Sequence, residues 1–109
     1  MDRKKVLKSL NLPDKPVGAA LRLVILTHEG NRRTFHVYVQ KCIFGEDFIR
    51  LEISTKQIKG ISFDRLVRHV VNDEPVDSWI ASPLQPTTRE HDAGIRWQVL
   101  EFTPLPAAG

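Results

Sequence analysis

The sequence between Arg33 and Phe44 alternates strictly between two kinds of side chain, and this feature constrains the fold most. One set comprises Phe35, Val37, Val39 and Ile43, and the other comprises Thr34, His36, Tyr38, Gln40 and Cys42. Successive side chains of an extended chain point to opposite faces, so the pattern predicts a β-strand with one buried face. Such a strand needs neighbours with which to pair, and the chain must therefore contain a sheet.

Two flanking segments supply those neighbours. Residues 21–25 alternate in the same way and stop at a turn cluster, 28–31, and residues 48–54 follow a second turn at 45–47. The residues expected on one face of the latter segment are Ile49, Leu51 and Ile53, with Phe48, Arg50 and Glu52 on the other. Because short turns join consecutive strands, the sequence predicts an antiparallel meander of three strands.

After Gly60 the apolar spacing changes to that of a helix. Ser62 suits an N-cap, and the carboxylate of Asp64 suits the first turn. The apolar stripe comprises Phe63, Leu66, Val67, Val70 and Val71. We expect a helix that ends near Asp73, with Asp64 and Arg68 paired across one turn, and this main helix would cover the apolar face of the meander.

The N-terminal residues 1–13 are expected to form a short basic helix or arm. Val6, Leu7 and Leu10 fall on one side among several lysines, and Pro13 interrupts the helix because proline lacks the amide hydrogen. Since domains cluster near 100 to 150 residues, a chain of 109 residues holds one domain. That domain is expected to span residues 14–109.

The segment 74–94 contains three prolines and no sustained period, which predicts a long loop. Ile95, Trp97 and Val99 then alternate with Arg96 and Gln98, as in a fourth strand. The fold class expected from these elements is α+β, with a small antiparallel sheet of the meander and the late strand packed on one main helix.

Several functional classes are excluded or disfavoured by what the sequence does not contain. Cys42 is the single cysteine, so neither an internal disulfide nor a thiolate zinc site can form within one chain. The spacings of His28, His36, His69 and His91 match no metal motif, and no nucleophile-elbow, phosphate-loop or dinucleotide fingerprint occurs. We therefore expect a protein that is not an enzyme and has no metal or cofactor. No apolar run approaches the ~20 residues that cross a bilayer, and no signal-like apolar region follows the basic start, so a cytoplasmic protein with no membrane association is expected.

Charge is distributed unevenly along the chain. Residues 1–59 contain twelve Lys and Arg against six Asp and Glu, whereas residues 60–109 contain four against seven. A basic half attracts a phosphate-bearing or acidic partner, and a polar sheet face with an aromatic ring can stack bases. The first functional hypothesis is nucleic-acid binding through the sheet face. Its predicted contacts are Arg22, Arg32, Arg33, His36, Tyr38, Lys41, Arg50 and Lys56.

The competing hypothesis is a protein-interaction module, an adaptor or inhibitor of another protein. Trp79, Ile80 and Leu84 lie in the proline-bounded loop and could anchor a protein partner or a second copy in a homodimer. An exposed strand edge, or an acidic protein surface fitted to the basic face, would serve the same purpose.

One group of residues is similar in part to cyclic-dinucleotide-binding PilZ domains. Arg32 and Arg33 precede a strand, and Glu52, Ser54 and Gly60 follow. The acidic-x-Ser-x-x-Gly spacing of that family requires glycine at position 57, where this chain has glutamine, so the sequence is not assigned to the family.

Overall fold

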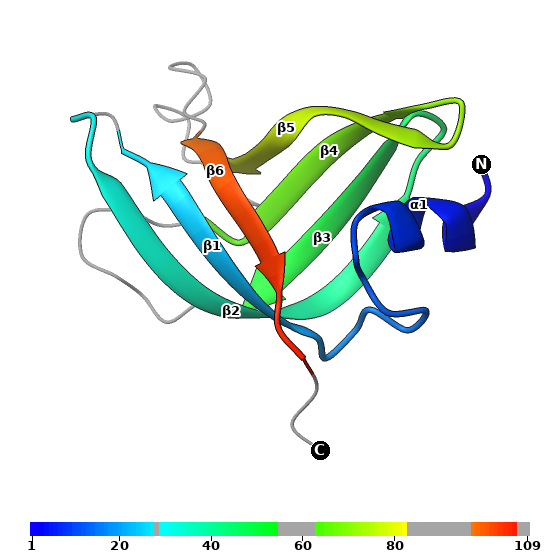
Figure 1. The fold of residues 1–109 in the computed structure, drawn as a ribbon, viewed down its shortest axis with the longest axis horizontal. Coiled ribbons are helices and arrows are strands. Elements are labelled where there is room, and N and C mark those ends of the chain that lie inside the picture. Colours follow the sequence, from blue (N-terminus) through cyan, green and yellow to red (C-terminus); the bar gives the residue numbers. More distant parts are fainter. Residues whose placement is uncertain (28, 55–62, 83–96, 107–109) are drawn as a thin grey trace.

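In the part of the chain that the structure describes, six strands form a closed antiparallel barrel, with one short helix at its end (Figure 1). The computed structural model describes residues 1–27, 29–54, 63–82 and 97–106. The elements are α1 (Arg3–Ser9), β1 (Ala20–Leu26), β2 (Arg32–Phe44), β3 (Phe48–Ser54), β4 (Arg65–Val71), β5 (Glu74–Ser82) and β6 (Trp97–Pro104). Each strand pairs with the next in the sequence, and β6 returns to pair with β1.

The expected α+β fold is therefore wrong, because the predicted main helix is strand β4. Leu66 and Val70 are four residues apart, a spacing that fits both a helical stripe and the inner face of a strand. Both are buried, whereas Val71 is 54% exposed, so inner and outer positions alternate as in a strand. Leu66 pairs with Leu51 of β3, and the Asp64–Arg68 turn of a helix does not form. The β-branched valines of this segment favour a strand.

The first part of the predicted loop 74–94 is also regular. β4 and β5 are joined by Asn72 and Asp73, whose φ angles of 50° and 63° are those of a tight hairpin turn. Asn and Asp tolerate this left-handed conformation better than other residues with a side chain. The hairpin turns Glu74–Ser82 into a strand, and the rest of the predicted loop lies outside the described residues.

The predicted meander of the first three strands is confirmed, with one correction to its faces. A register shift between Val39 and Lys41 places an extra residue in β2. After this β-bulge the alternation changes phase, so Cys42 pairs with the buried Leu51 and packs against the core, while Ile43 pairs with Arg50 on the outer face. The assignment of Ile43 to the inner face and of Cys42 to the outer face was therefore wrong.

The interior of the barrel is the hydrophobic core. At one end Phe63 lies edge-on to Phe35, with ring centroids 5.1 Å apart, and near Trp97. At the other end α1 contributes the buried residues Val6 and Leu7, which are 0% and 4% exposed. Within the described part of the chain, no helix has the length and apolar character needed to cross a membrane.

The predicted N-terminal helix is confirmed as α1, and two contacts of Asp2 hold it in place. The Asp2 side chain accepts a hydrogen bond from the backbone N–H of Lys5 at 3.2 Å and so caps the helix. The backbone N–H of Asp2 donates to the carboxylate of Asp73 at 2.8 Å, in the β4–β5 turn. The helix is thereby tied to the barrel at its first residue.

Candidate nucleic-acid interface

A groove with a volume of about 1420 Å³ lies between α1, the segment that leads into β1, and the end of β6. Its lining residues are Asp2, Lys4, Lys5, Lys8, Asn11, Leu12, Pro13, Asp14, Gly18, Ala19, Ala20, Tyr38, Pro104, Leu105 and Pro106. We call this the α1 groove. Large concave sites with an apolar lining and a few polar groups are the usual form of binding sites.

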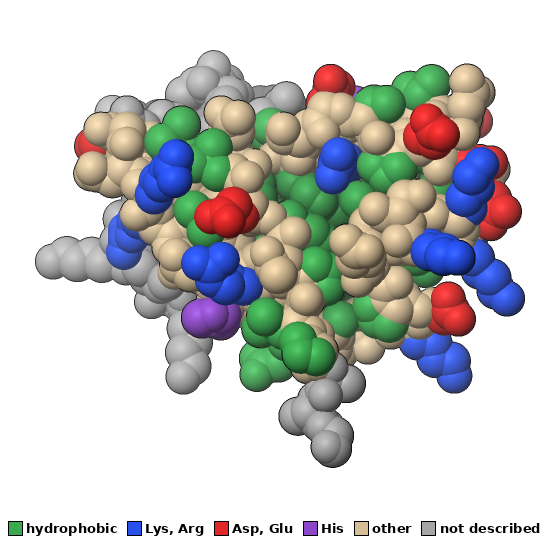
Figure 2. Space-filling model, viewed as in Figure 1, with side chains coloured by type: hydrophobic (Ala, Val, Ile, Leu, Met, Phe, Trp, Pro, Cys, Tyr) green, Lys and Arg blue, Asp and Glu red, His purple; other side chains and the backbone are tan. Residues whose placement is uncertain are grey.

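Lysines form one wall of the α1 groove. Because Val6, Leu7 and Leu10 of α1 are turned into the barrel, the lysines on the remaining faces of the helix are left exposed. Lys4 and Lys8 are one helical turn apart, which places them on the same side. Figure 2 shows Lys and Arg side chains gathered over the side of the molecule that α1 forms.

The remainder of the α1 groove is largely apolar and is held by backbone hydrogen bonds. The N–H of Leu105 donates to the carbonyl of Ala20 at 2.9 Å, so the chain beyond β6 stays beside the start of β1. The N–H of Gly18 donates to the carbonyl of Val39 at 2.7 Å, and Gly18 has a φ of 91°, which favours glycine. The groove is therefore built into the backbone and does not depend on side chains alone.

Three of the predicted nucleic-acid contacts lie next to each other, in a row that starts at the edge of this groove. Tyr38 is 58% exposed on the outer face of β2, and it pairs with Ala20 of β1. Arg22 and His36 form the outward-facing pair two residues further along the same strands. An exposed aromatic ring, a guanidinium and an imidazole thus form a strip that begins at the α1 groove.

Two other predicted contacts, Lys41 and Arg50, belong to a separate cluster. Their nitrogens lie 3.9 and 3.7 Å from the carboxylate of Glu52, and Glu52 pairs with Arg65 of β4. Arg50 Nε is buried and has no hydrogen-bond partner among the described residues. Two cationic side chains thus flank one carboxylate, and a third cation, Arg65, is at the register position opposite Glu52, with its Nε donating to the hydroxyl of Ser82.

The predicted contacts Arg32 and Arg33 are the first two residues of β2. Arg32 is exposed, and the guanidinium of Arg33 lies 5.9 Å from the ring centroid of Phe35. At the ~3.3 Å rise of a strand, Arg32 is about 20 Å from Tyr38. These two arginines therefore do not belong to the α1 groove, and Lys56 lies outside the described residues.

The residues predicted for protein contact are placed differently. Trp79 is 2% exposed and packs within the core, and Ile80 is half-buried and pairs with Val67. Leu84 lies outside the described residues. Because the sheet closes on itself, the expected open strand edge is replaced by the junction of β5 with β6.

Sequence reasoning did not select Lys4, Lys5 and Lys8 as contacts, although the basic character of the first helix was evident. The missing information was the position of the chain after β6. Only the fold places Pro104 and Leu105 opposite the helix and turns a basic arm into one wall of a groove.

The single cysteine has the environment of a structural thiol. Burial raises the pKa of the Cys42 thiol, and the positive charge of Arg3 partly offsets this. A protonated thiol is a poor nucleophile at neutral pH. Across the ranges that the structure describes, no group of three or more His, Cys, Asp or Glu is arranged to hold a metal ion.

Comparisons with known proteins found no matching family model, no matching curated protein and no matching solved structure. The function is therefore inferred from the residues of this chain.

Proposed function

We propose that this protein binds single-stranded nucleic acid in the α1 groove and along the strip formed by Tyr38, His36 and Arg22. The observation that carries the proposal is the combination, in one site, of a lysine wall, an apolar floor and an exposed aromatic ring at its end.

The chemistry of a single strand matches these three parts. Unpaired bases have apolar faces that stack on aromatic side chains, and each nucleotide carries a negative phosphate. The ring of Tyr38, with Pro104 at the end of β6 and Pro106 beyond it, would contact bases. Lys4, Lys5 and Lys8 would contact phosphates. A duplex keeps its base faces stacked inside the helix and would use the lysines alone.

The α1 groove is also suited to an acidic protein segment, so the protein-interaction hypothesis keeps one of its features. Its other two features, the Trp79 loop and the strand edge, lose their basis because Trp79 is buried and the sheet is closed. We therefore place nucleic acid first and include an acidic peptide as an arm of the test.

The test is fluorescence anisotropy with labelled single-stranded DNA, single-stranded RNA, duplex DNA and a Glu-rich peptide, at about 50 and 200 mM salt, where phosphate contacts weaken steeply. Tight binding of the single strands that weakens with salt is expected. Absence of binding to every nucleic acid at the lower salt concentration would refute the proposal, and tight binding of the peptide alone would favour the alternative.

Two matched pairs of variants locate the site. Tyr38→Ala should weaken single-strand binding by about 1–3 kcal/mol, roughly 5- to 150-fold, whereas Thr34→Ala on the same face of β2 should not. Lys8→Gln should reduce the slope of log affinity against log salt by about 0.7 for one lost phosphate contact, and Lys41→Gln, outside the groove, should leave it unchanged.

A further inference from the structure

The junction between β5 and β6 is the least complete part of the barrel. The pairing described there comprises Ile80 with Gln98 and Ala81 with Trp97, although β6 pairs with β1 up to its last residue, Pro104. Beyond these two pairs the strands diverge. The last residue of α1, Ser9, and the two residues that follow it lie against the opening.

A small cavity of about 240 Å³ occupies this opening, and we call it the seam cavity. Its lining residues are Ser9, Leu10, Asn11, Arg68, Asp77, Ser78, Trp79, Val99, Leu100 and Phe102. The volume is below the ~300 to 1,000 Å³ of sites for larger organic ligands, so the cavity suits a small group. None of the residues that carry the proposed nucleic-acid contacts lines it.

Arg68 occupies an inner position of β4, which is unusual for a charged residue in a barrel. It lies between the buried Leu66 and Val70 in the alternation, and it pairs with Ile49, which is fully buried. A β-bulge in β5 opposite Arg68 makes room for it, and Asp77 in the bulge adopts a φ of 57°.

The donors of Arg68 are poorly satisfied in this position. Its Nε donates a hydrogen bond to the carbonyl of Val76, and at 3.4 Å this bond is long. Burial lowers the pKa of Arg68, and the nearby charge of Asp77 raises it in compensation. Asp77 offers charge compensation, but within the described residues no ion pair forms between the two.

A second donor at the seam cavity has no partner at all among the residues described. Trp79 lines the cavity and is 2% exposed, and its Nε1 is buried without a hydrogen-bond acceptor. Buried donors are nearly always paired, so an exception calls for an explanation, and a bound water or ion is one such explanation. Arg68, whose one side-chain hydrogen bond to protein is long, and Trp79, whose indole N–H has no acceptor among the described residues, thus line the same small cavity.

We propose that the seam cavity binds a small oxyanion, a carboxylate or phosphate group, through the guanidinium of Arg68 and the indole N–H of Trp79. A guanidinium presents a planar fork of donors that matches two oxygens of such a group. The hydroxyl of Ser78 is a further donor, whereas the hydroxyl of Ser9 already donates to the carbonyl of Lys5 at 2.9 Å. The negative charge of Asp77 repels the anion and so limits the affinity. Removing this charge should therefore strengthen binding, whereas removing the charge of Arg68 should weaken it.

The test uses the fluorescence of Trp79. The chain contains two tryptophans, so Trp97→Phe leaves Trp79 as the single reporter. Sodium phosphate and sodium acetate are titrated at constant ionic strength, with sodium chloride as the control for a simple anion. A saturable change in emission with phosphate or acetate, absent with chloride, is expected at millimolar concentrations.

Three further variants assign the change to the seam cavity. Arg68→Gln should weaken binding about tenfold or more, Asp77→Asn should strengthen it several-fold, and Arg65→Gln on the outer face of β4 should leave it unchanged. Circular dichroism checks that each variant folds. If Arg68→Gln does not fold, Asp77→Asn alone tests the proposal, through the expected increase in affinity.

Removal of the indole N–H is tested without fluorescence. Trp79→Phe keeps a ring in the core, and phosphate binding is followed by phosphorus NMR. A several-fold weaker binding than in the parent protein is expected. The proposal is overturned if phosphate and acetate give no saturable change, if chloride acts equally, or if Arg68→Gln and Asp77→Asn bind like the parent. None of these outcomes bears on the α1 groove, which is tested with Tyr38 and Lys8.

Discussion

The rings of Trp79 in β5 and Phe102 in β6 are stacked, with centroids 4.6 Å apart and planes 19° from parallel. The two residues lie where the strands have diverged beyond their last described backbone pairs, at Ile80 and Ala81. An aromatic contact therefore connects β5 to β6 where the hydrogen-bond ladder between them has ended. The barrel is closed at this position by side-chain packing.

We predict that Trp79→Ala destabilises the protein by about 3–5 kcal/mol, since it removes a large buried ring. Phe102→Ala should cost less, because Phe102 is half-buried. In a double-mutant cycle the two should couple by about 0.5–1.5 kcal/mol, the contribution of a ring pair beyond the area it buries. Denaturant unfolding measures all three values. Additive effects of the two substitutions would show that the ring stack does not stabilise the contact between β5 and β6.

A second prediction distinguishes the strand β4 from the helix that the sequence suggests for the same segment. As a strand, β4 buries Leu66 fully and leaves Val71 54% exposed, whereas the helical stripe would bury both. Leu66→Ala should cost about 2–5 kcal/mol and Val71→Ala within about 0.5 kcal/mol. The measurement is again denaturant unfolding. A large loss for Val71→Ala would contradict the strand assignment.

These positions show why the sequence predicts the first half of the barrel and fails in the second. The β2 segment alternates over many residues, and no helix fits it. In β4 the inner positions Leu66 and Val70 are four residues apart, a spacing that a helix and a strand share, whereas Val67 and Val71 would join them only in a helix and lie on the outer face of the strand. Local spacing could not decide between them, and the decision comes from pairing of β4 with β3 on one side and β5 on the other.

For the candidate site, the sequence identified the polar strip but not the groove. Arg22, His36 and Tyr38 follow directly from the alternation of two paired strands. The α1 groove requires Tyr38, the lysines of α1 and the chain after β6 to meet, and these come from three distant parts of the sequence. Barrel closure brings β6 beside β1, and no local pattern encodes that closure.

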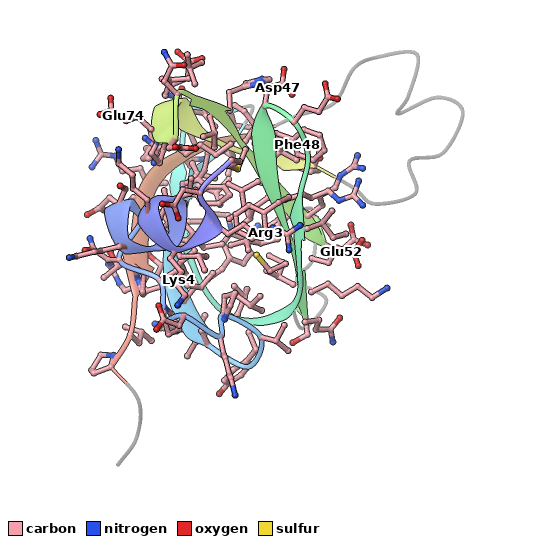
Figure 3. The ribbon with its side chains drawn as sticks, turned by 90° about the vertical axis from the view of Figure 1, so that its right-hand side faces the viewer. Arg3, Lys4, Asp47, Phe48, Glu52 and Glu74 are labelled. Carbon is pink, nitrogen blue, oxygen red and sulfur yellow. The ribbon has the colours of Figure 1, made fainter. Side chains whose placement is uncertain are left out.

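A third prediction concerns the thiol of Cys42. Figure 3 shows Arg3 extending from α1 toward β2 and β3, and its guanidinium lies 5.2 Å from the ring centroid of Phe44. Burial raises the pKa of Cys42 and Arg3 lowers it. Arg3→Gln should therefore raise that pKa further and slow the reaction with a thiol reagent at a given pH. Lys4→Gln, on the groove side of α1, is the control. The rate measured against pH gives each pKa.

The same shift has a consequence for stability. Because the folded protein holds the thiol proton more tightly than the unfolded chain, the contribution of Cys42 is fully present below the unfolded pKa of about 8.5 and is lost as the pH rises through the folded pKa. Cys42→Ser should remove this part of the pH dependence. An unfolding curve of Cys42→Ser that falls above pH 8.5 as steeply as that of the parent would show that other groups are responsible.

The last prediction concerns Asp2, which both caps α1 and ties it to the barrel. Asp2→Ala removes the acceptor for the N–H of Lys5, and loss of an N-cap costs about 0.5–2 kcal/mol. The bond from the Asp2 backbone to Asp73 remains possible in this variant, whereas Asp73→Ala removes that bond and leaves the cap. Hydrogen exchange should show faster opening of α1 in both variants, while the amides of β2 and β3 exchange as in the parent. Asp2 lines the α1 groove, so Asp2→Ala also removes a negative charge from the proposed phosphate site, and the binding test therefore uses Asp73→Ala. Since α1 forms the lysine wall, Asp73→Ala should weaken single-strand binding, and normal binding with a freely opening α1 would show that the helix is not part of the site.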